Sequence, residues 1–140
     1  MKKIITAAAV FCFALVFSQK NQNYLEIGYA SICCGPPSDQ PVMSYLKEFK
    51  KKNQIKSLEI LKQSGLGREG EFALYIGTDY LTKNQKNRLI RGLMATVSNQ
   101  NQNQSNNKKQ SNKGNVNFDS ATVVNQSDLM NAKNLTIYKK

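Results

Sequence analysis

The sequence predicts a small α+β protein in which two helices cover one face of an antiparallel sheet. Its 140 residues provide enough chain for a single domain. Several short segments alternate apolar and polar side chains, which is typical of half-buried strands. Two longer segments carry apolar residues three or four positions apart behind a helix-start signal, which indicates amphipathic helices.

The N-terminal segment, 1–18, has the composition of a cleaved signal peptide. Lys2 and Lys3 precede an apolar run over 4–17, and the residues at 16–18 suit a signal peptidase. The run is shorter than the ~20 apolar residues that a membrane-spanning helix needs, and no later segment is long enough. We therefore expect an exported protein, periplasmic or secreted, without a transmembrane segment in its mature chain.

Charge and composition narrow the classes of partner and of chemistry. Removing Lys2 and Lys3 leaves 18 basic and nine acidic residues, a net charge of +9. This charge favours an acidic envelope polymer or protein partner, although solubility is the simpler explanation because the charge is spread over several segments. Export, and the lack of aromatic residues among the basic ones, argue against a nucleic-acid partner. The chain has no His, which excludes Ser-His-Asp and Cys-His catalysis and His-bearing zinc sites.

The first strand and the first helix are predicted over 24–29 and 39–52. In the strand, Leu25, Ile27 and Tyr29 share one face. Ser38 or Asp39 can cap the helix, and Pro41 suits its first turn because proline has no N–H to leave unpaired. An apolar stripe along the helix then faces the core, formed by Val42, Leu46 and Phe49.

A β-hairpin is predicted next, with strands over 55–63 and 71–77 joined by a glycine-rich turn over 64–70. Lys56 and Lys62 lie near the ends of its first strand, where their long side chains can extend outward. The inward-facing residues of the two strands are Leu58, Ile60, Phe72, Leu74 and Ile76.

The second helix, over 82–97, is the element with the most complete sequence signature. Thr82 and Gln85 form a capping box, in which each side chain accepts a hydrogen bond from a backbone N–H at the helix start. Two adjacent apolar rows follow and indicate a core-facing surface: Leu89, Leu93 and Val97 in one row, Ile90 and Met94 in the other.

The chain beyond this helix divides into a polar segment, 98–115, and a C-terminal segment, 116–140. The polar segment has no apolar side chain that could offset the entropy of ordering its backbone, so we expect a disordered linker. The C-terminal segment contains strand-like sequence at 116–124 and 135–138, separated by a turn or short helix. We expect one of these two strands to return to the sheet and complete it.

The predicted order of elements in the core domain, 24–97, and the segment after it is the split βαβ arrangement of ferredoxin-like sandwiches. Right-handed crossovers then put the first strand in the centre, the third beside it and the second outside the third. The returning C-terminal strand lies on the other flank, and both helices cover one face. This topology brings the Cys33-Cys34 turn, the 64–70 turn and the start of the linker to one end of the sheet, where we expect the functional site.

Cys33 and Cys34 are the most distinctive side chains of the mature chain, and three outcomes are compatible with them. They form a vicinal disulfide, they bind a soft metal such as Cu(I) as a thiol pair, or they are buried as small apolar residues. Adjacent strand residues point to opposite faces, so one of the two could belong to the core. The N–H groups of the helix start, together with Arg68 of the neighbouring turn, favour a thiolate at Cys34 over one at Cys33.

The turn after the first strand, Cys34-Gly35-Pro36, resembles the active-site loop of the thioredoxin family, and the segments at 77 and 81–85 resemble that family's last strand and helix. The resemblance implies thiol–disulfide exchange, but Pro37 occupies the position of the family's second cysteine. Heavy-metal-associated domains are similar in carrying cysteines in the first loop of a ferredoxin-like fold. Their cysteines are separated by two residues, whereas here they are adjacent.

The turn at 65–70 spells G-x-G-x-x-G, but a strand follows it where a dinucleotide site needs a helix, so we interpret it as hairpin-turn sequence. Arg68 and Glu69 at its tip are candidate contact residues. Glu69 and Glu71 lack the burial that an acid/base pair requires. The leading hypothesis is therefore an exported, non-enzymatic binding or structural module that uses Cys33, Cys34, Arg68 and Glu69. The alternative is a thiol-dependent protein that binds Cu(I) or another soft metal, or exchanges disulfides, through its two adjacent cysteines.

Overall fold

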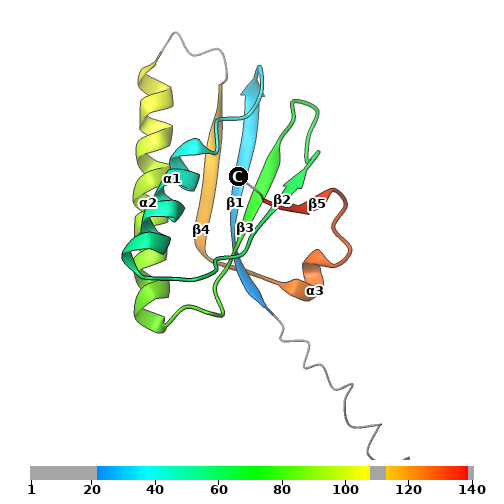
Figure 1. Ribbon diagram of the computed structural model, residues 1–140. Coiled ribbons are helices and arrows are strands. Elements are labelled where there is room, and N and C mark those ends of the chain that lie inside the picture. The colour runs from blue at the N-terminus through cyan, green and yellow to red at the C-terminus, as the bar shows by residue number, and fades with distance from the viewer. Residues whose placement is uncertain (1–21, 108–112, 139–140) are drawn as a thin grey trace, which may run out of the picture.

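A computed structural model describes residues 22–107 and 113–138, and these residues form an α+β fold with five strands and three helices (Figure 1). The predicted signal peptide, 1–18, lies outside the described residues. None of the helices in the described ranges is long and apolar enough to cross a membrane. The elements in chain order are β1 (Asn23–Cys33), α1 (Gln40–Lys52), β2 (Ile60–Ser64), β3 (Phe72–Gly77), α2 (Lys83–Asn106), β4 (Lys113–Asn125), α3 (Gln126–Leu129) and β5 (Leu135–Ile137).

The five strands form one sheet in the order β4-β1-β3-β2-β5, and every neighbouring pair is antiparallel. The predicted α+β class with an antiparallel sheet is therefore confirmed. We expected only one C-terminal segment to join the sheet, but both do, since β4 pairs with β1 and β5 pairs with β2 on the opposite edge. Each of the two added strands pairs with backbone N–H and C=O groups of the strand it joins, β1 on one side and β2 on the other.

Helices α1 and α2 lie on the same face of the sheet and enclose the main core (Figure 1). The expected apolar stripe of α1 is buried there, as are Leu89, Leu93 and Val97 of α2. The capping box of Thr82 and Gln85 is also present, with the Gln85 N–H donating to Thr82 Oγ1 at 3.2 Å. From the sheet, this core receives Leu25, Ile27, Tyr29, Phe72, Leu74, Ile76 and Val116.

A second, smaller core lies on the other face of the sheet, where α3 covers part of it. Leu129 of α3 packs there with Tyr24, Ala73 and Tyr75. Because both faces are covered, every residue of β3 is buried. β3, the central strand of the sheet, is therefore buried along its whole length.

The first strand of the hairpin is shorter than the predicted 55–63, because β2 begins only at Ile60. The Ile55 N–H donates to the Lys50 carbonyl at 3.0 Å, so this part of the backbone completes the end of α1 and cannot join a strand. Lys62 does not extend outward as expected. Its Nζ lies 3.9 Å from the centre of the Phe72 ring, on the helix-covered face.

The prediction of a helix ending at 97 and a disordered linker over 98–115 is wrong for most of that segment. Helix α2 continues to Asn106, and β4 already begins at Lys113, while 108–112 lie outside the described residues. Amide side chains hold the extra helical turns in place of apolar ones. Gln100 Nε2 donates to the Ser38 carbonyl at 2.6 Å, and Asn101 makes two hydrogen bonds with the backbone of Val116.

Candidate functional site

The end of β1, the β2–β3 turn and the start of β4 meet at one end of the sheet (Figure 1). We expected the start of the linker there, but Ser98 lies within α2, and it is β4 that begins at this end. Cys33 at the end of β1 pairs with Lys113 at the start of β4. The β2–β3 turn lies beside the loop that follows the cysteines, because a Cβ added to Gly70 would lie 4.0 Å from Pro36 Cδ. The segments singled out from the sequence are therefore brought together.

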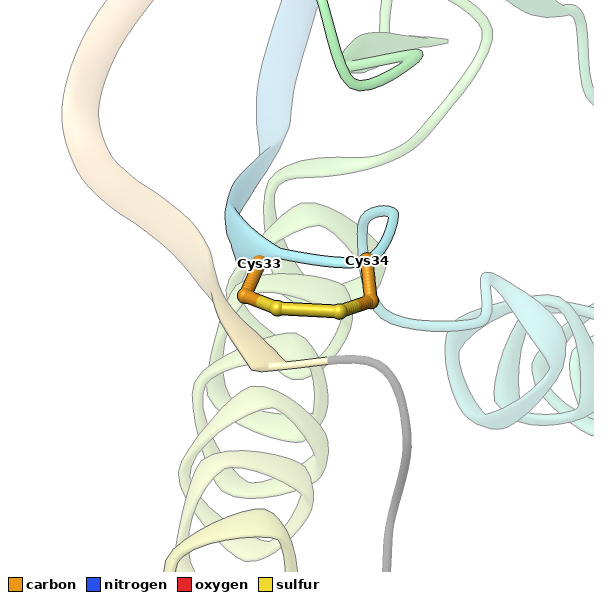
Figure 2. The surroundings of a disulfide bond; sticks show 2 residues. All are labelled: Cys33 and Cys34. Atoms are coloured by element: carbon orange, nitrogen blue, oxygen red, sulfur yellow. A yellow bond between two sulfur atoms is a disulfide. The ribbon is translucent and has the colours of Figure 1, made fainter.

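Cys33 and Cys34 are joined by a disulfide at the tip of β1 (Figure 2). Both residues are exposed, so the interpretation of either one as a core residue is wrong. The burial of β1 falls toward its end, where its pairing with β4 becomes irregular between Ser31 and Cys33. Cys34 and Gly35 both have positive φ, 69° and 100°, and turn the chain back toward α1.

Two apolar residues that the sequence analysis did not single out are exposed at this end. Ile32 is 72% exposed beside the cysteines, and Leu66 in the β2–β3 turn is 49% exposed. We call Ile32, Cys33, Cys34, Leu66, Arg68 and Glu69 the sheet-end surface. The sequence signal for this surface was Ile32, an apolar residue that directly precedes the cysteine pair. At this point of β1 its side chain is exposed and does not belong to the core.

Arg68 and Glu69 are exposed at the β2–β3 turn, and the Glu69 N–H donates to the Glu71 carboxylate at 2.9 Å. No hydrogen bond or ion pair between described residues connects Arg68 to either cysteine. Within the described ranges, no group of three or more His, Cys, Asp or Glu residues is arranged to hold a metal ion. In the reduced state, a soft metal would therefore depend on the two adjacent thiols.

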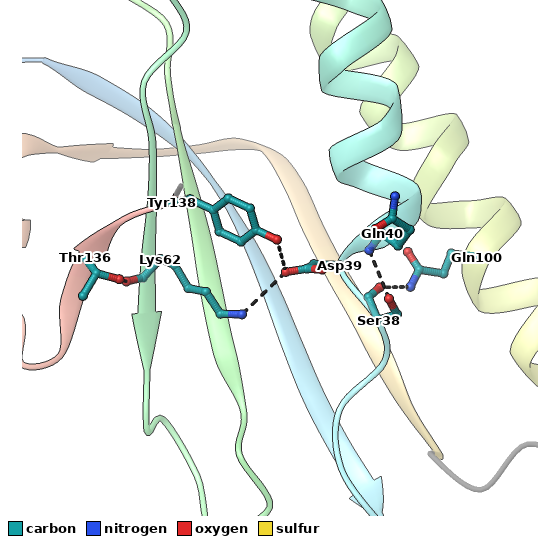
Figure 3. Close-up of polar contacts among 7 residues, drawn as sticks. All are labelled: Ser38, Asp39, Gln40, Lys62, Gln100, Thr136 and Tyr138. Atoms are coloured by element: carbon teal, nitrogen blue, oxygen red, sulfur yellow. Dashed lines mark hydrogen bonds and ion pairs between the residues drawn. The ribbon is translucent and has the colours of Figure 1, made fainter. Parts of the chain in front are cut away.

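A polar cluster lies where α1 begins and connects it to β2 and to the residue that follows β5 (Figure 3). The Tyr138 hydroxyl donates to Asp39 Oδ2 at 2.8 Å, and Lys62 Nζ lies 3.5 Å from the same oxygen. The side chains of Lys62 and Asp39 are only 28% and 13% exposed. Burial, followed by the hydrogen bond to Asp39, raises the pKa of Tyr138 to about 12. We expected Ser38 or Asp39 to cap the helix. Asp39 stands at the N-cap position without a capping hydrogen bond from its side chain, and Ser38 Oγ accepts a hydrogen bond from the Gln40 N–H at 3.1 Å.

Tyr29 is buried beside this cluster. Its hydroxyl has no hydrogen-bond partner among the described residues, and its ring stacks on Phe72 with the centroids 4.3 Å apart. Burial and the nearby Asp39 carboxylate raise the pKa of Tyr29, so it remains a neutral phenol. The cluster offers an ion pair and hydrogen bonds, but no activated nucleophile beside a base.

The comparisons with known proteins add no relative. No protein-family model matches the chain, and searches of the curated proteins and of the solved structures found no similar protein.

Proposed function

We propose that this chain is an exported binding or structural module that contacts an acidic protein partner through the sheet-end surface. The observation that carries the proposal is the exposure of Ile32 and Leu66 at the end of the sheet that also presents the disulfide. Exposed apolar residues gathered beside polar ones are typical of interaction sites. Lys113 and Arg68 at the same end supply positive charge, and the chain as a whole has an excess of basic residues.

Site-specific photocrosslinking in cells that express the protein tests this proposal. A photoreactive residue at Ile32 is compared with the same residue at Met94, which is 52% exposed on α2, away from the sheet end. We expect a discrete protein adduct from position 32 and none from position 94. Equal adducts from both positions, or none from position 32, would contradict the proposal.

N-terminal sequencing of the exported protein tests the predicted cleavage after Ser18 in the same cells.

The exposure of both cysteines favours a second candidate, a thiol-dependent function. A dithiol partner would reduce the Cys33–Cys34 disulfide with two electrons and two protons, and would itself be oxidised to a disulfide. The reduced pair would then offer two thiolates to Cu(I) or another soft metal.

Intact mass with and without reductant, followed by Cu(I) titration, distinguishes the two candidates. Both candidates predict that the mass rises by two hydrogens on reduction, because both contain the disulfide. The thiol-dependent function alone requires that Cu(I) binds the reduced protein and not the Cys33→Ser/Cys34→Ser variant. Unchanged metal uptake by the variant, together with unreactive cysteines in the native protein, would remove this candidate and leave the binding module.

The ferredoxin-like sandwich remains our proposal for the fold family. It is supported by the order β4-β1-β3-β2 and by the antiparallel pairing of each neighbour. In this proposal β5 and α3 are additions to the split βαβ arrangement, with β5 at the edge next to β2.

A further inference from the structure

Helix α1 borders a groove on the helix-covered face of the sheet, beside β2 and the residue that follows β5. Neighbouring strands lie roughly 4.8 Å apart and a helix is about 10 Å wide, so two helices cover about four strands. The fifth strand therefore leaves part of this face without a helix. The resulting groove, which we call the α1 groove, has a volume of about 530 Å³.

The floor of the α1 groove is apolar. Ile60 and Tyr138 meet there because the Tyr138 N–H donates to the Ile60 carbonyl at 2.8 Å. Tyr138 is held in place at its far end by the hydrogen bond from its hydroxyl to Asp39 (Figure 3). The apolar residues that line the groove are Met43, Leu46, Leu58, Ile60 and Tyr138.

The rim of the groove is positively charged. Lys47 and Lys50 line it from α1, one helical turn apart, and both are exposed. Neither forms an ion pair with a described residue, whereas Lys52 pairs with Glu48 and Lys62 with Asp39. The groove has no acidic residue in its lining.

We propose that the α1 groove binds a free fatty acid, with the acyl chain on the apolar floor and the carboxylate between Lys47 and Lys50. The groove volume lies within the ~300–1,000 Å³ of small-molecule sites. An apolar floor suits an alkyl chain, and two unpaired lysines suit a single anionic head. A hydrophilic anion would have no alkyl chain to pack on the apolar floor. A neutral lipid would have no charge to pair with Lys47 and Lys50.

A larger cavity of about 760 Å³ on the other side of Leu58 and Tyr138 is a weaker candidate. Polar residues such as Asn53 and Gln54 share its lining about equally with apolar ones, and the acidic Glu59 among them would repel a carboxylate. The lysines of α1 have a simpler explanation in the dipole of the helix C-terminus, which favours cations at Lys50, Lys51 and Lys52 alike. The experiment therefore compares lysines of the same helix.

Calorimetric titration of the full mature chain with decanoate, decanol and butyrate tests the proposal. Decanol has the same number of carbons without the charge, and butyrate has the charge with little chain. We expect one decanoate per protein, weaker binding of decanol and no measurable binding of butyrate. Lys47→Gln/Lys50→Gln should weaken decanoate binding about fivefold and leave decanol binding unchanged, because each exposed ion pair contributes modestly.

The matched variant Lys51→Gln/Lys52→Gln removes two charges from the same helix outside the groove, and we expect its decanoate affinity to equal that of the wild type. Ser44→Trp places a bulky side chain in the lining at an exposed helical position, and it should weaken decanoate and decanol alike. Three outcomes would overturn the proposal: no decanoate binding, an equal loss of affinity in both lysine variants, or wild-type binding in folded Ser44→Trp.

Discussion

Tyr138 connects three parts of the chain that are far apart in sequence. It directly follows β5, its backbone N–H donates to Ile60, and its hydroxyl donates to Asp39 at the start of α1. Removing the hydroxyl in Tyr138→Phe should cost about 1–2 kcal/mol at pH 7, because the acceptor is a charged carboxylate. Urea denaturation of the wild type and the variant measures this difference.

The contribution of Tyr138 should depend on pH in a defined direction. The folded-state pKa of about 12 lies above the ordinary value of 10.0, so the neutral hydroxyl is favoured by folding. The stability difference between the wild type and Tyr138→Phe should be constant from neutral pH to the ordinary value of 10.0 and should shrink as the pH rises toward about 12. A difference that grows over this range would contradict the assigned hydrogen bond.

Gly114 and Gly28 both lie in the β1–β4 ladder but differ in the space around them. A Cβ at Gly114 would meet the Ala30 carbonyl oxygen and lie 2.8 Å from Pro37 Cδ, whereas at Gly28 the nearest atom would be 4.0 Å away. Gly114→Ala should therefore cost about 1–3 kcal/mol, while Gly28→Ala should be neutral or slightly stabilising. Thermal unfolding of both variants checks this, and equal effects would show that the strand pairing there is looser than described.

The candidate site residues could be identified from the sequence more readily than their positions in the structure could be predicted from it. The cysteine pair stood out because the sequence has no His and no acid/base pair, but alternation along a strand could not tell where the buried part of β1 ends. That point coincides with the irregular pairing of β1 with β4, which the alternation does not show. The Asp39 contact with Lys62 and Tyr138 joins residues 23 and 99 positions apart, for which the sequence pattern contains no signal.

At the scale of elements, the extension of α2 is held by hydrogen bonds to an edge strand. Asn101 Nδ2 donates to the Val116 carbonyl at 2.9 Å, and the Val116 N–H donates to Asn101 Oδ1 at 3.0 Å. The amide thus occupies the place of a neighbouring strand at this point of β4. Apolar periodicity predicted most of α1 and the first turns of α2, but it could not predict a helix held in this way, because one amide among many carries no distinguishing pattern.

Asn101→Ala tests this role of the amide. The variant leaves the N–H and C=O of the buried Val116 without these partners, which should lower the free energy of unfolding by about 1–3 kcal/mol. Asn103→Ala is the matched control, since Asn103 is the same residue type and is exposed on the same helical turn. Hydrogen exchange should show faster exchange at Val116 and along 98–106 in the first variant only. If both variants behave alike, helix propensity and not the edge contact stabilises this segment.

At the scale of the whole molecule, stability comes from a sheet with both faces covered. The main core lies under α1 and α2, the second lies under α3, and both edges end in features that limit further pairing. Asn101 covers part of β4, and β5 is only three residues long. The fold class and the two helices followed from periodicity and caps. The second core did not, because Leu129 lies in a four-residue helix that is too short to show a period.

The Cys33–Cys34 disulfide should contribute little to this stability. The two cysteines are adjacent in sequence, so the bond closes almost no loop and removes little conformational freedom from the unfolded chain. Reduction, or the Cys33→Ser/Cys34→Ser variant, should change the free energy of unfolding by less than about 1 kcal/mol in urea denaturation. A loss of about 3 kcal/mol or more would mark the disulfide as a structural bond. The expected small change would mean that a binding or redox defect of the variant reports on the sheet-end surface itself, because the two cores remain intact.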